Sequence, residues 1–211
     1  MPRPDNPFSQ SCENNKRFIL DRIQDEFASG SCVLEIGSRT AQHVTFFAQQ
    51  MPLVRWLPSD IPENMATLVE CLDGQRYDNI AAPVALDVTQ NPWPLDPAGV
   101  DGAFSANTLH IMPLSAVECF FNGVGRVLRP GGKLCVYGPF KYGGDFTTTS
   151  NAQFDANLRS GNPESGLRDI EHVAALATAQ NMHLLRDHAM PANNQLLIWQ
   201  KRPLFTDGVT Q

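Results

Sequence analysis

The 211-residue sequence has no two cysteines at C-x-x-C spacing, and it has only five cysteines in all. Secreted domains held by disulfides and structural zinc sites both depend on paired or clustered cysteines. The odd and scattered set therefore predicts free thiols in a reducing compartment and no metal site.

Long apolar runs and clustered basic residues are also missing. No stretch is apolar over the roughly 20 residues that a membrane-spanning helix needs, and residues 1–7 lack the apolar core of a secretory signal. Lys and Arg number 16 against 22 Asp and Glu, a formal net charge of −6, and they form no basic patch that could follow a phosphate backbone. We expect a cytoplasmic protein with a small-molecule partner and without nucleic acid or membrane, whose oligomeric state the sequence leaves open.

What the chain does have is a strand–turn–helix unit over residues 31–51. Residues 33–36 form the short apolar run of a strand buried on both faces. Apolar residues then recur at helical spacing from Val44 to Met51. The turn between them, Gly37–Thr40, would present free backbone N–H groups and a helix N-terminus to a ligand, as nucleotide-binding units do.

Strand-like and helix-like patterns alternate along the rest of the chain. Further strands are expected over residues 54–57, 82–88, 100–105, 133–138, 183–189 and 195–201. Helices are expected from Ser11 to a stop at Gly30, over 63–72, over 113–128 and over 167–177, whereas 139–165 has no period and is expected to be irregular. We predict one α/β domain over residues 1–211, with 1–10 as an extended arm and a doubly wound, Rossmann-like, mostly parallel sheet that ends in an antiparallel hairpin.

Ligands of such sheets bind at the carboxyl ends of the strands. This topology places Gly37–Thr40, Asp60, Asp87, Asn107–His110, the 139–165 loop and the 190–194 turn on one rim. Asp60 closes the next strand, where an acidic residue accepts hydrogen bonds from ribose hydroxyls. The alternative is that Asp60 caps the helix that Pro62 opens.

A dinucleotide site is the natural competitor. Its G-x-G-x-x-G fingerprint needs glycines at positions 39 and 42, where this chain has Arg39 and Gln42. Without these small residues the loop leaves little room for a pyrophosphate, so an NAD(P)-dependent oxidoreductase ranks third among the functions considered.

Several segments resemble class I S-adenosylmethionine (SAM)-dependent methyltransferases: Val33–Ser38, Asp60, Leu86–Val88 and Val127–Gly132. More narrowly, the chain resembles the methyltransferase-like 26 family, also known as domain of unknown function 938. The similar segments are Asn15-Lys16, Trp56–Asp60, Ser105–His110, Tyr137–Phe140, Thr149–Asn151, Phe154-Asp155, Gly166–Asp169 and Met190–Asn194. This resemblance runs from about residue 14 to residue 200, and it implies a seven-stranded sheet with SAM as cofactor but no known substrate.

The resemblance also implies roles for individual residues. Glu35, Gly37 and Ser38 would hold the methionine end of SAM, with Arg39 and Thr40 in the same loop and Asn107 near the amino-acid moiety. Asp60 would bind the ribose diol. Ile61 and Val88 would pack against the adenine, and Asp87 would face its amino group. The family pattern Gly-Ser-Gly-Thr-Gly reads Gly-Ser-Arg-Thr-Ala here. Arg39 adds bulk but can pair with a carboxylate, and Ala41 restricts the backbone. The alternative is therefore a SAM-binding or interaction protein without methyl transfer.

The acceptor side depends on His110, which follows the fourth strand and could accept a proton at neutral pH. Alternatively, His110 is structural and caps the helix that begins at Pro113. Phe140, Asn151, Asp155 and Asn194 are candidates for an acceptor pocket, unless they only satisfy their own loop. The Asn-Pro-Pro-Tyr signature of nucleic-acid amino-methylating enzymes is replaced by Asn107-Thr-Leu-His110. The sequence thus predicts a SAM-dependent methyltransferase with a small-molecule acceptor.

Overall fold

The computed structural model describes residues 7–74 and 77–203. The first six residues of the expected N-terminal arm lie outside the described part. The first helix, α1 (Gln10–Ile23), begins one residue earlier than predicted and ends well before the expected stop at Gly30. Its N-cap is Ser9, whose hydroxyl accepts a hydrogen bond from the backbone N–H of Cys12 at 3.3 Å.

Seven strands form one sheet in the order β3-β2-β1-β4-β5-β10-β9. Their bounds are Cys32–Ile36 (β1), Arg55–Asp60 (β2), Val84–Ala85 (β3), Val100–Ala106 (β4), Leu128–Gly138 (β5), Met182–Met190 (β9) and Asn194–Lys201 (β10). β10 runs antiparallel to both of its neighbours, and the pairs from β3 to β5 are parallel. The predicted doubly wound sheet with its terminal hairpin is confirmed, although the strand expected over 82–88 contracts to two residues.

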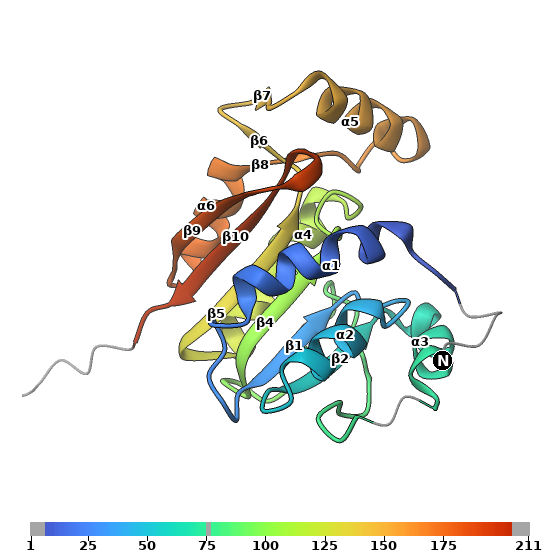
Figure 1. The fold of residues 1–211 in the computed structure, drawn as a ribbon. Coiled ribbons are helices and arrows are strands. Elements are labelled where there is room, and N and C mark those ends of the chain that lie inside the picture. The colour runs from blue at the N-terminus through green and yellow to red at the C-terminus, as the bar shows by residue number, and fades with distance from the viewer. Residues whose placement is uncertain (1–6, 75–76, 204–211) are drawn as a thin grey trace, which may run out of the picture.

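Helices cover both faces of this sheet (Figure 1). On one face lie α1, α2 (Gln42–Gln50) and α3 (Met65–Leu72), the last preceded by the short helix η1 (Pro62–Asn64); on the other lie α4 (Leu114–Val127) and α6 (Ile170–Ala179). Successive strand side chains serve opposite cores, as Val33 packs with Phe47 whereas Leu34 packs with Phe121. Two-sided burial explains why the strands read as continuous apolar runs.

The prediction that residues 139–165 are irregular is wrong. This segment holds β6 (Phe140–Tyr142), β7 (Asp145–Phe146) and the 13-residue helix α5 (Thr149–Gly161), and with β8 (Arg168–Asp169) the two strands make a small sheet above the main one (Figure 1). The residues that α5 buries are polar, so no apolar period marks it. Its start is fixed by Thr148, whose hydroxyl accepts from the Asn151 N–H at 3.2 Å.

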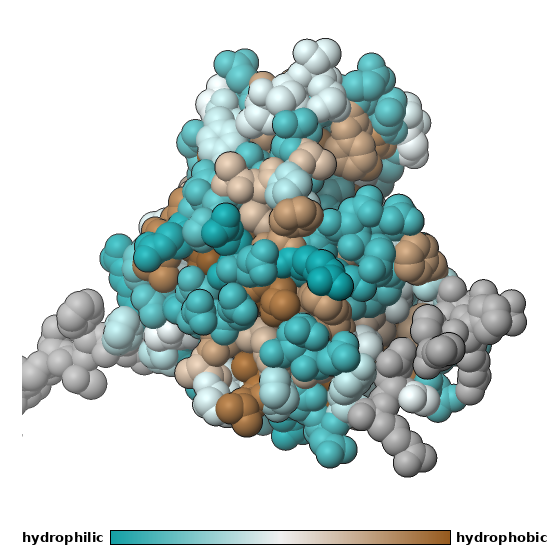
Figure 2. All heavy atoms as spheres, viewed as in Figure 1, coloured by the Kyte–Doolittle hydropathy of each residue, from teal (hydrophilic) through white to brown (hydrophobic). Residues whose placement is uncertain are grey.

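No helix within the described residues is both long and apolar enough to cross a membrane. In the view of Figure 2, apolar surface is visible at α5 among mainly hydrophilic side chains.

Candidate functional site

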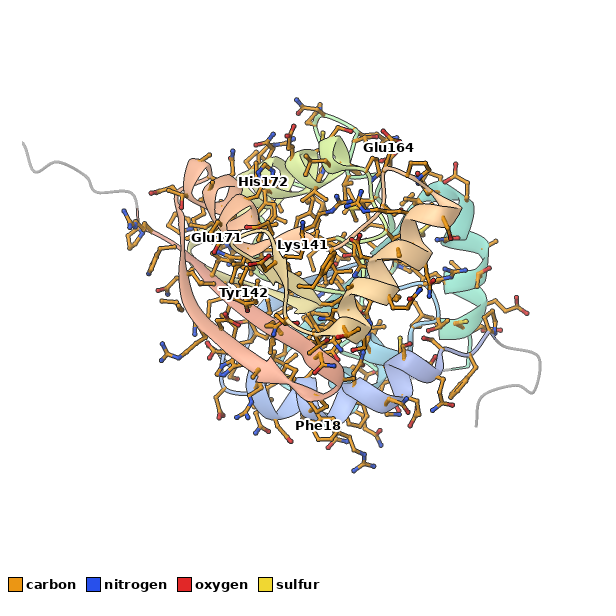
Figure 3. The ribbon with its side chains drawn as sticks, turned by 90° about the horizontal axis from the view of Figure 1, so that it is seen from above. Phe18, Lys141, Tyr142, Glu164, Glu171 and His172 are labelled. Atoms are coloured by element: carbon orange, nitrogen blue, oxygen red, sulfur yellow. The ribbon has the colours of Figure 1, made fainter. Side chains whose placement is uncertain are left out.

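A cavity of about 1220 Å³ opens at the carboxyl ends of the parallel strands. Its walls come from α1, the ends of β1 to β5, the start of α4, α5 and the short helix η2 (Pro191–Asn193) between β9 and β10. Figure 3 views the molecule from the side on which α5 lies. The cavity is therefore at the edge where the topology predicts a ligand.

Most of the sequence-predicted site residues line this cavity: Gly37, Ser38, Arg39, Thr40, Asp60, Ile61, Asp87, Val88, Asn107, His110, Asn151 and Asn194. Glu35, Phe140 and Asp155 are not among the lining residues. The fold thus brings together side chains separated by more than 150 positions in the sequence.

The loop after β1 keeps a glycine-like backbone although two of its positions are not glycine. Gly37 has φ +84°, and a Cβ on it would lie 2.7 Å from the Thr108 Cγ2. Arg39 and Ala41 also lie in the left-handed region, with φ of 37° and 57°. Each such non-glycine residue costs roughly 1–2 kcal/mol. The side chain of Arg39 is exposed, so its bulk does not force the loop apart.

Hydrogen bonds to β2 hold this strained loop in place. The backbone N–H groups of Gly37 and Ser38 both donate to the Ser59 carbonyl oxygen, at 3.0 and 2.9 Å. The Arg39 N–H donates to Asp60 Oδ2 at 2.7 Å. The loop and the end of β2 therefore form one unit that positions the Asp60 carboxylate beside the cavity.

Asp60 has limited capacity left for a ligand. Its Oδ1 accepts from the Ile61 N–H at 2.8 Å and from Asn64 Nδ2 at 2.7 Å, while Oδ2 accepts from Arg39. A carboxylate offers about four acceptor positions, so one remains on Oδ2. The alternative that Asp60 caps the helix opened by Pro62 is wrong, because the N-cap residue of η1 is Ile61 and no side chain makes a capping hydrogen bond there.

Glu35 lies beneath the loop and is 2% exposed. Its Oε2 has no hydrogen-bond partner in the described structure. The pKa of Glu35 is raised to about 7. Burial is the main cause, a hydrogen bond from Ser38 opposes it, and the charge of Asp60 adds to it. An unpartnered buried carboxylate oxygen is rare in folded proteins and indicates a missing donor or cation.

The residues expected around the adenosine, Ile61, Asp87 and Val88, line the cavity, and so does Asn107, which is expected near the amino-acid moiety. Asp87 Oδ1 accepts from the N–H and hydroxyl of Thr89, at 2.9 and 2.8 Å. Ile61 is 41% exposed, whereas Val88 is buried against the core below the cavity. Asn107 is held in a left-handed conformation, φ 58°, by a 2.8 Å hydrogen bond from its N–H to the Tyr137 carbonyl oxygen.

His110 also lines the cavity and is buried, at 6% exposure. Its ring meets the Phe154 ring edge to face, with 5.3 Å between centroids, and forms no hydrogen bond to any residue that the structure describes. Burial, and secondarily the charge of Arg168, lowers the pKa of His110 to about 4, so the imidazole is neutral at pH 7. The capping alternative is wrong, because the N-cap of α4 is Pro113 and no side chain caps the helix.

Two of the four predicted acceptor-pocket residues have purely structural surroundings. Phe140 is 1% exposed and belongs to the main core. Asp155 accepts hydrogen bonds from Arg159 Nε and from the Leu167 N–H, both at 2.7 Å, and thereby ties α5 to the segment before β8. The expectation that Phe140 and Asp155 line the pocket is therefore not met by this structure, because both side chains are already occupied by packing or pairing.

Helix α1 is the part of the site that sequence reasoning missed. Ser9, Cys12, Asn15 and Phe18 are among its lining residues. The Asn15 Oδ1 lies 2.7 Å from His43 Nε2 on α2, which docks the helix against the loop. The sequence signal was the buried face of α1, where polar residues 12 and 15 continue the line of apolar residues 19 and 23.

No group of three or more side chains within the described residues could hold a metal ion. The cavity instead combines exposed backbone, carboxylates and neutral polar groups, an arrangement suited to an organic ligand.

Comparison with known protein families gives a match over nearly the whole chain. The model of the family described as "Protein of unknown function (DUF938)" matches residues 6–201.

Among solved structures, the chain is similar to the SAM-dependent methyltransferase SibL in its apo form, with a TM-score of 0.75, 16% identity and coverage of 92% of this chain and 56% of that one. Human N-acetylserotonin methyltransferase in complex with SAM gives a TM-score of 0.75, 15% identity and coverage of 92% and 53%. An O-methyltransferase family 2 protein from Planctomyces limnophilus in complex with apigenin gives 0.70, 18% identity and coverage of 90% and 60%. This chain thus spans a little over half the length of these proteins, and the likeness establishes a shared fold.

Proposed function

We propose that this chain, which belongs to the DUF938 family, is a SAM-dependent methyltransferase that acts on a small molecule. The observation that carries the proposal is the pairing of the left-handed Gly37–Ala41 loop with the Asp60 carboxylate at one wall of the cavity. Such a loop and acid present N–H donors and a ribose acceptor side by side.

The residues present fit SAM in charge as well as in shape. Asp60 and Asp87 line this end of the cavity against one cation, Arg39, and the carboxyl group of Glu35 is buried beneath the loop. SAM is a net cation, because its sulfonium and ammonium outweigh its carboxylate, whereas the pyrophosphate of NAD(P) is an anion. The electrostatics therefore favour SAM over a dinucleotide.

Individual groups would divide the ligand between them. Asp60 would accept from a ribose hydroxyl at its remaining position, and Ile61 and Val88 would flank the adenine. Glu35 is buried beneath the loop and does not line the cavity, so it would act on the methionine end through the loop. When bound, SAM supplies a methyl group on a positively charged sulfur. Loss of one hydrogen bond to a charged group would weaken binding by about 10- to 150-fold.

His110 is the group placed to accept a hydrogen bond from the methyl acceptor, and its pKa of about 4 makes it only a weak base for proton uptake at pH 7. It is neutral at pH 7, lines the cavity and has no described side chain bonded to its ring. Positioning of the two reactants supplies much of the rate in displacement reactions. Methyl transfer would therefore not depend on His110, which would only assist it. The narrower likeness to methyltransferase-like 26 proteins stays a prediction.

Calorimetric titration of SAM and of NAD into the full chain tests the proposal. SAM should bind and NAD should not. Asp60→Asn should weaken SAM by at least about tenfold, while Glu63→Gln, which removes an exposed carboxylate three residues away, should leave the affinity unchanged. Absence of SAM binding at millimolar ligand would sink the proposal. If SAM binds, fractions of a cytosolic metabolite extract are added as a source of acceptors. Turnover to S-adenosylhomocysteine with any fraction would exclude the binding-protein alternative, and no turnover with all fractions would favour it.

A further inference from the structure

Charge is distributed unevenly around the cavity. Among the described residues that line it, the charged ones are Arg39, Asp60 and Asp87, and each follows the carboxyl end of β1, β2 or β3. The lining residues contributed by α1, by residues 106–116, by the end of β5, by α5 and by residues 191–194 carry no Asp, Glu, Lys or Arg. We call this second region the neutral half.

Charged side chains near the neutral half are already engaged elsewhere. Arg168 donates through Nε to the Leu109 carbonyl at 3.0 Å and through a terminal nitrogen to the Met112 and Glu164 carbonyls. Lys16 pairs with Glu13 at 2.7 Å. Both cations are therefore already bonded to other groups of the protein, and neither lines the cavity. An ionised group of a ligand in the neutral half would be desolvated without a counter-charge.

Apolar side chains form the mouth of this half. Phe18, Ile111 and Phe154 are 49%, 54% and 39% exposed, and all three line the cavity. Phe18 comes from α1 and lies near the edge of the molecule in the view of Figure 3. Large apolar side chains that stay partly exposed around a cavity indicate contact with an apolar ligand.

One polar group stands out within this apolar and neutral surface. The His110 ring is against Phe154, and its nitrogens are unbonded within the described part of the chain. A neutral imidazole has one nitrogen that accepts a hydrogen bond. A buried acceptor of this kind favours a ligand that carries a donor such as a hydroxyl.

We propose that the methyl acceptor is an uncharged, mainly apolar molecule that donates a hydroxyl hydrogen bond to His110. This proposal rests on the proposed function, because only a methyltransferase would use the bound molecule as a methyl acceptor. The binding preference itself is a property of the neutral half and can be measured without methyl transfer.

The experiment uses four naphthalene probes of nearly equal size at neutral pH: 2-naphthol, its methyl ether 2-methoxynaphthalene, the anion 2-naphthoate and the cation 2-naphthylmethylammonium. Each is titrated calorimetrically into the full chain with saturating S-adenosylhomocysteine and again without it. We expect 2-naphthol to bind at least about tenfold more tightly than either ion, because the ions lose hydration without a partner.

Two variants locate the hydroxyl. His110→Phe keeps an aromatic ring but removes the acceptor, so 2-naphthol should lose about tenfold in affinity while 2-methoxynaphthalene should be unaffected. His172→Phe is the matched control, since His172 is an exposed residue of α6 (Figure 3) and should change neither affinity.

Equal or tighter binding of either ion overturns the proposal, and so does the failure of all four probes when S-adenosylhomocysteine itself binds. Equal losses for 2-naphthol and 2-methoxynaphthalene in His110→Phe would reject the hydroxyl contact. If S-adenosylhomocysteine gives no heat but 2-naphthol still binds selectively, the cofactor assignment fails and the neutral pocket stands. The two proposals therefore fail in different ways.

Discussion

The backbone N–H of Arg39 donates a 2.7 Å hydrogen bond to Asp60 Oδ2, so the residue that departs from glycine in the loop is held by the acid expected to bind ribose. Its φ of 37° shows that the left-handed conformation persists without glycine. Strain of this kind is retained only where the surrounding structure fixes it.

Arg39→Gly should release this strain. Because the side chain is exposed and glycine adopts a positive φ freely, the free energy of unfolding should rise by about 1 kcal/mol. Urea denaturation of the two proteins measures the difference. Arg55→Gly, at an exposed position of β2, is the control and should destabilise the protein instead. A loss of stability in Arg39→Gly would show that the arginine side chain contributes contacts outweighing the strain.

Gly37→Ala should have the opposite effect. The new Cβ meets Thr108 Cγ2 at 2.7 Å at a φ of +84°, so we expect a loss of roughly 1–3 kcal/mol and weaker SAM binding. Thr108→Ser removes the clashing methyl but keeps the hydroxyl that contacts Ser105, so the double variant should recover part of the stability. Gly161→Ala, where an added Cβ meets nothing, should be neutral or stabilising. A double variant no better than Gly37→Ala would assign the whole cost to the backbone.

The carboxyl of Glu35 should give stability a distinct pH dependence. Its pKa rises from 4.5 to about 7 on folding, so the stability it contributes is complete below about pH 4.5 and is lost as the pH rises through 7. Between these two pH values the free energy of unfolding should fall by roughly 3 kcal/mol through this group. Glu35→Gln removes this term, and the difference in unfolding free energy between variant and parent should therefore grow between pH 4.5 and 7. His43 and His110, with pKa values lowered to about 4, act in both proteins and cancel. A difference independent of pH would contradict the assignment.

Asn151 should control how firmly α5 is held over the cavity. Its Nδ2 donates to Thr147 Oγ1 at 2.9 Å and to the Asn193 carbonyl at 3.0 Å, across the gap between α5 and the β9–β10 turn. Asn151→Ala should accelerate hydrogen exchange of the α5 amides by about ten- to a hundredfold. Gln153→Ala, on the exposed side of the same helix, should leave exchange nearly unchanged. Similar protection in both variants would mean that packing alone holds α5.

The sequence predicted the parts of the molecule that are built by apolar burial. Val33 and Leu34 mark β1, and the position of Asp60 follows from the end of the next strand. Helix α5 was not predictable in this way, because polar residues such as Asn151 and Asp155 fix it through distant partners. The contribution of α1 to the site was missed for a related reason, since the docking of Asn15 on His43 joins positions that have no relation in sequence spacing.

The division of the cavity into a charged end and a neutral half has a consequence for how the chain can change. Among the lining residues, the charged end comes from residues 36–89, whereas most of the neutral half comes from residues 106–194. Helix α1 is the exception, since it belongs to the neutral half although it precedes the charged end in the sequence, and its Asn15 bonds to His43 of α2. Substitutions in α5 or the β9–β10 turn can therefore alter which molecule is accepted without disturbing the carboxylates. The residues proposed to set the acceptor preference are therefore mostly separate, in sequence, from those proposed to bind the cofactor, and Asn107 is the exception.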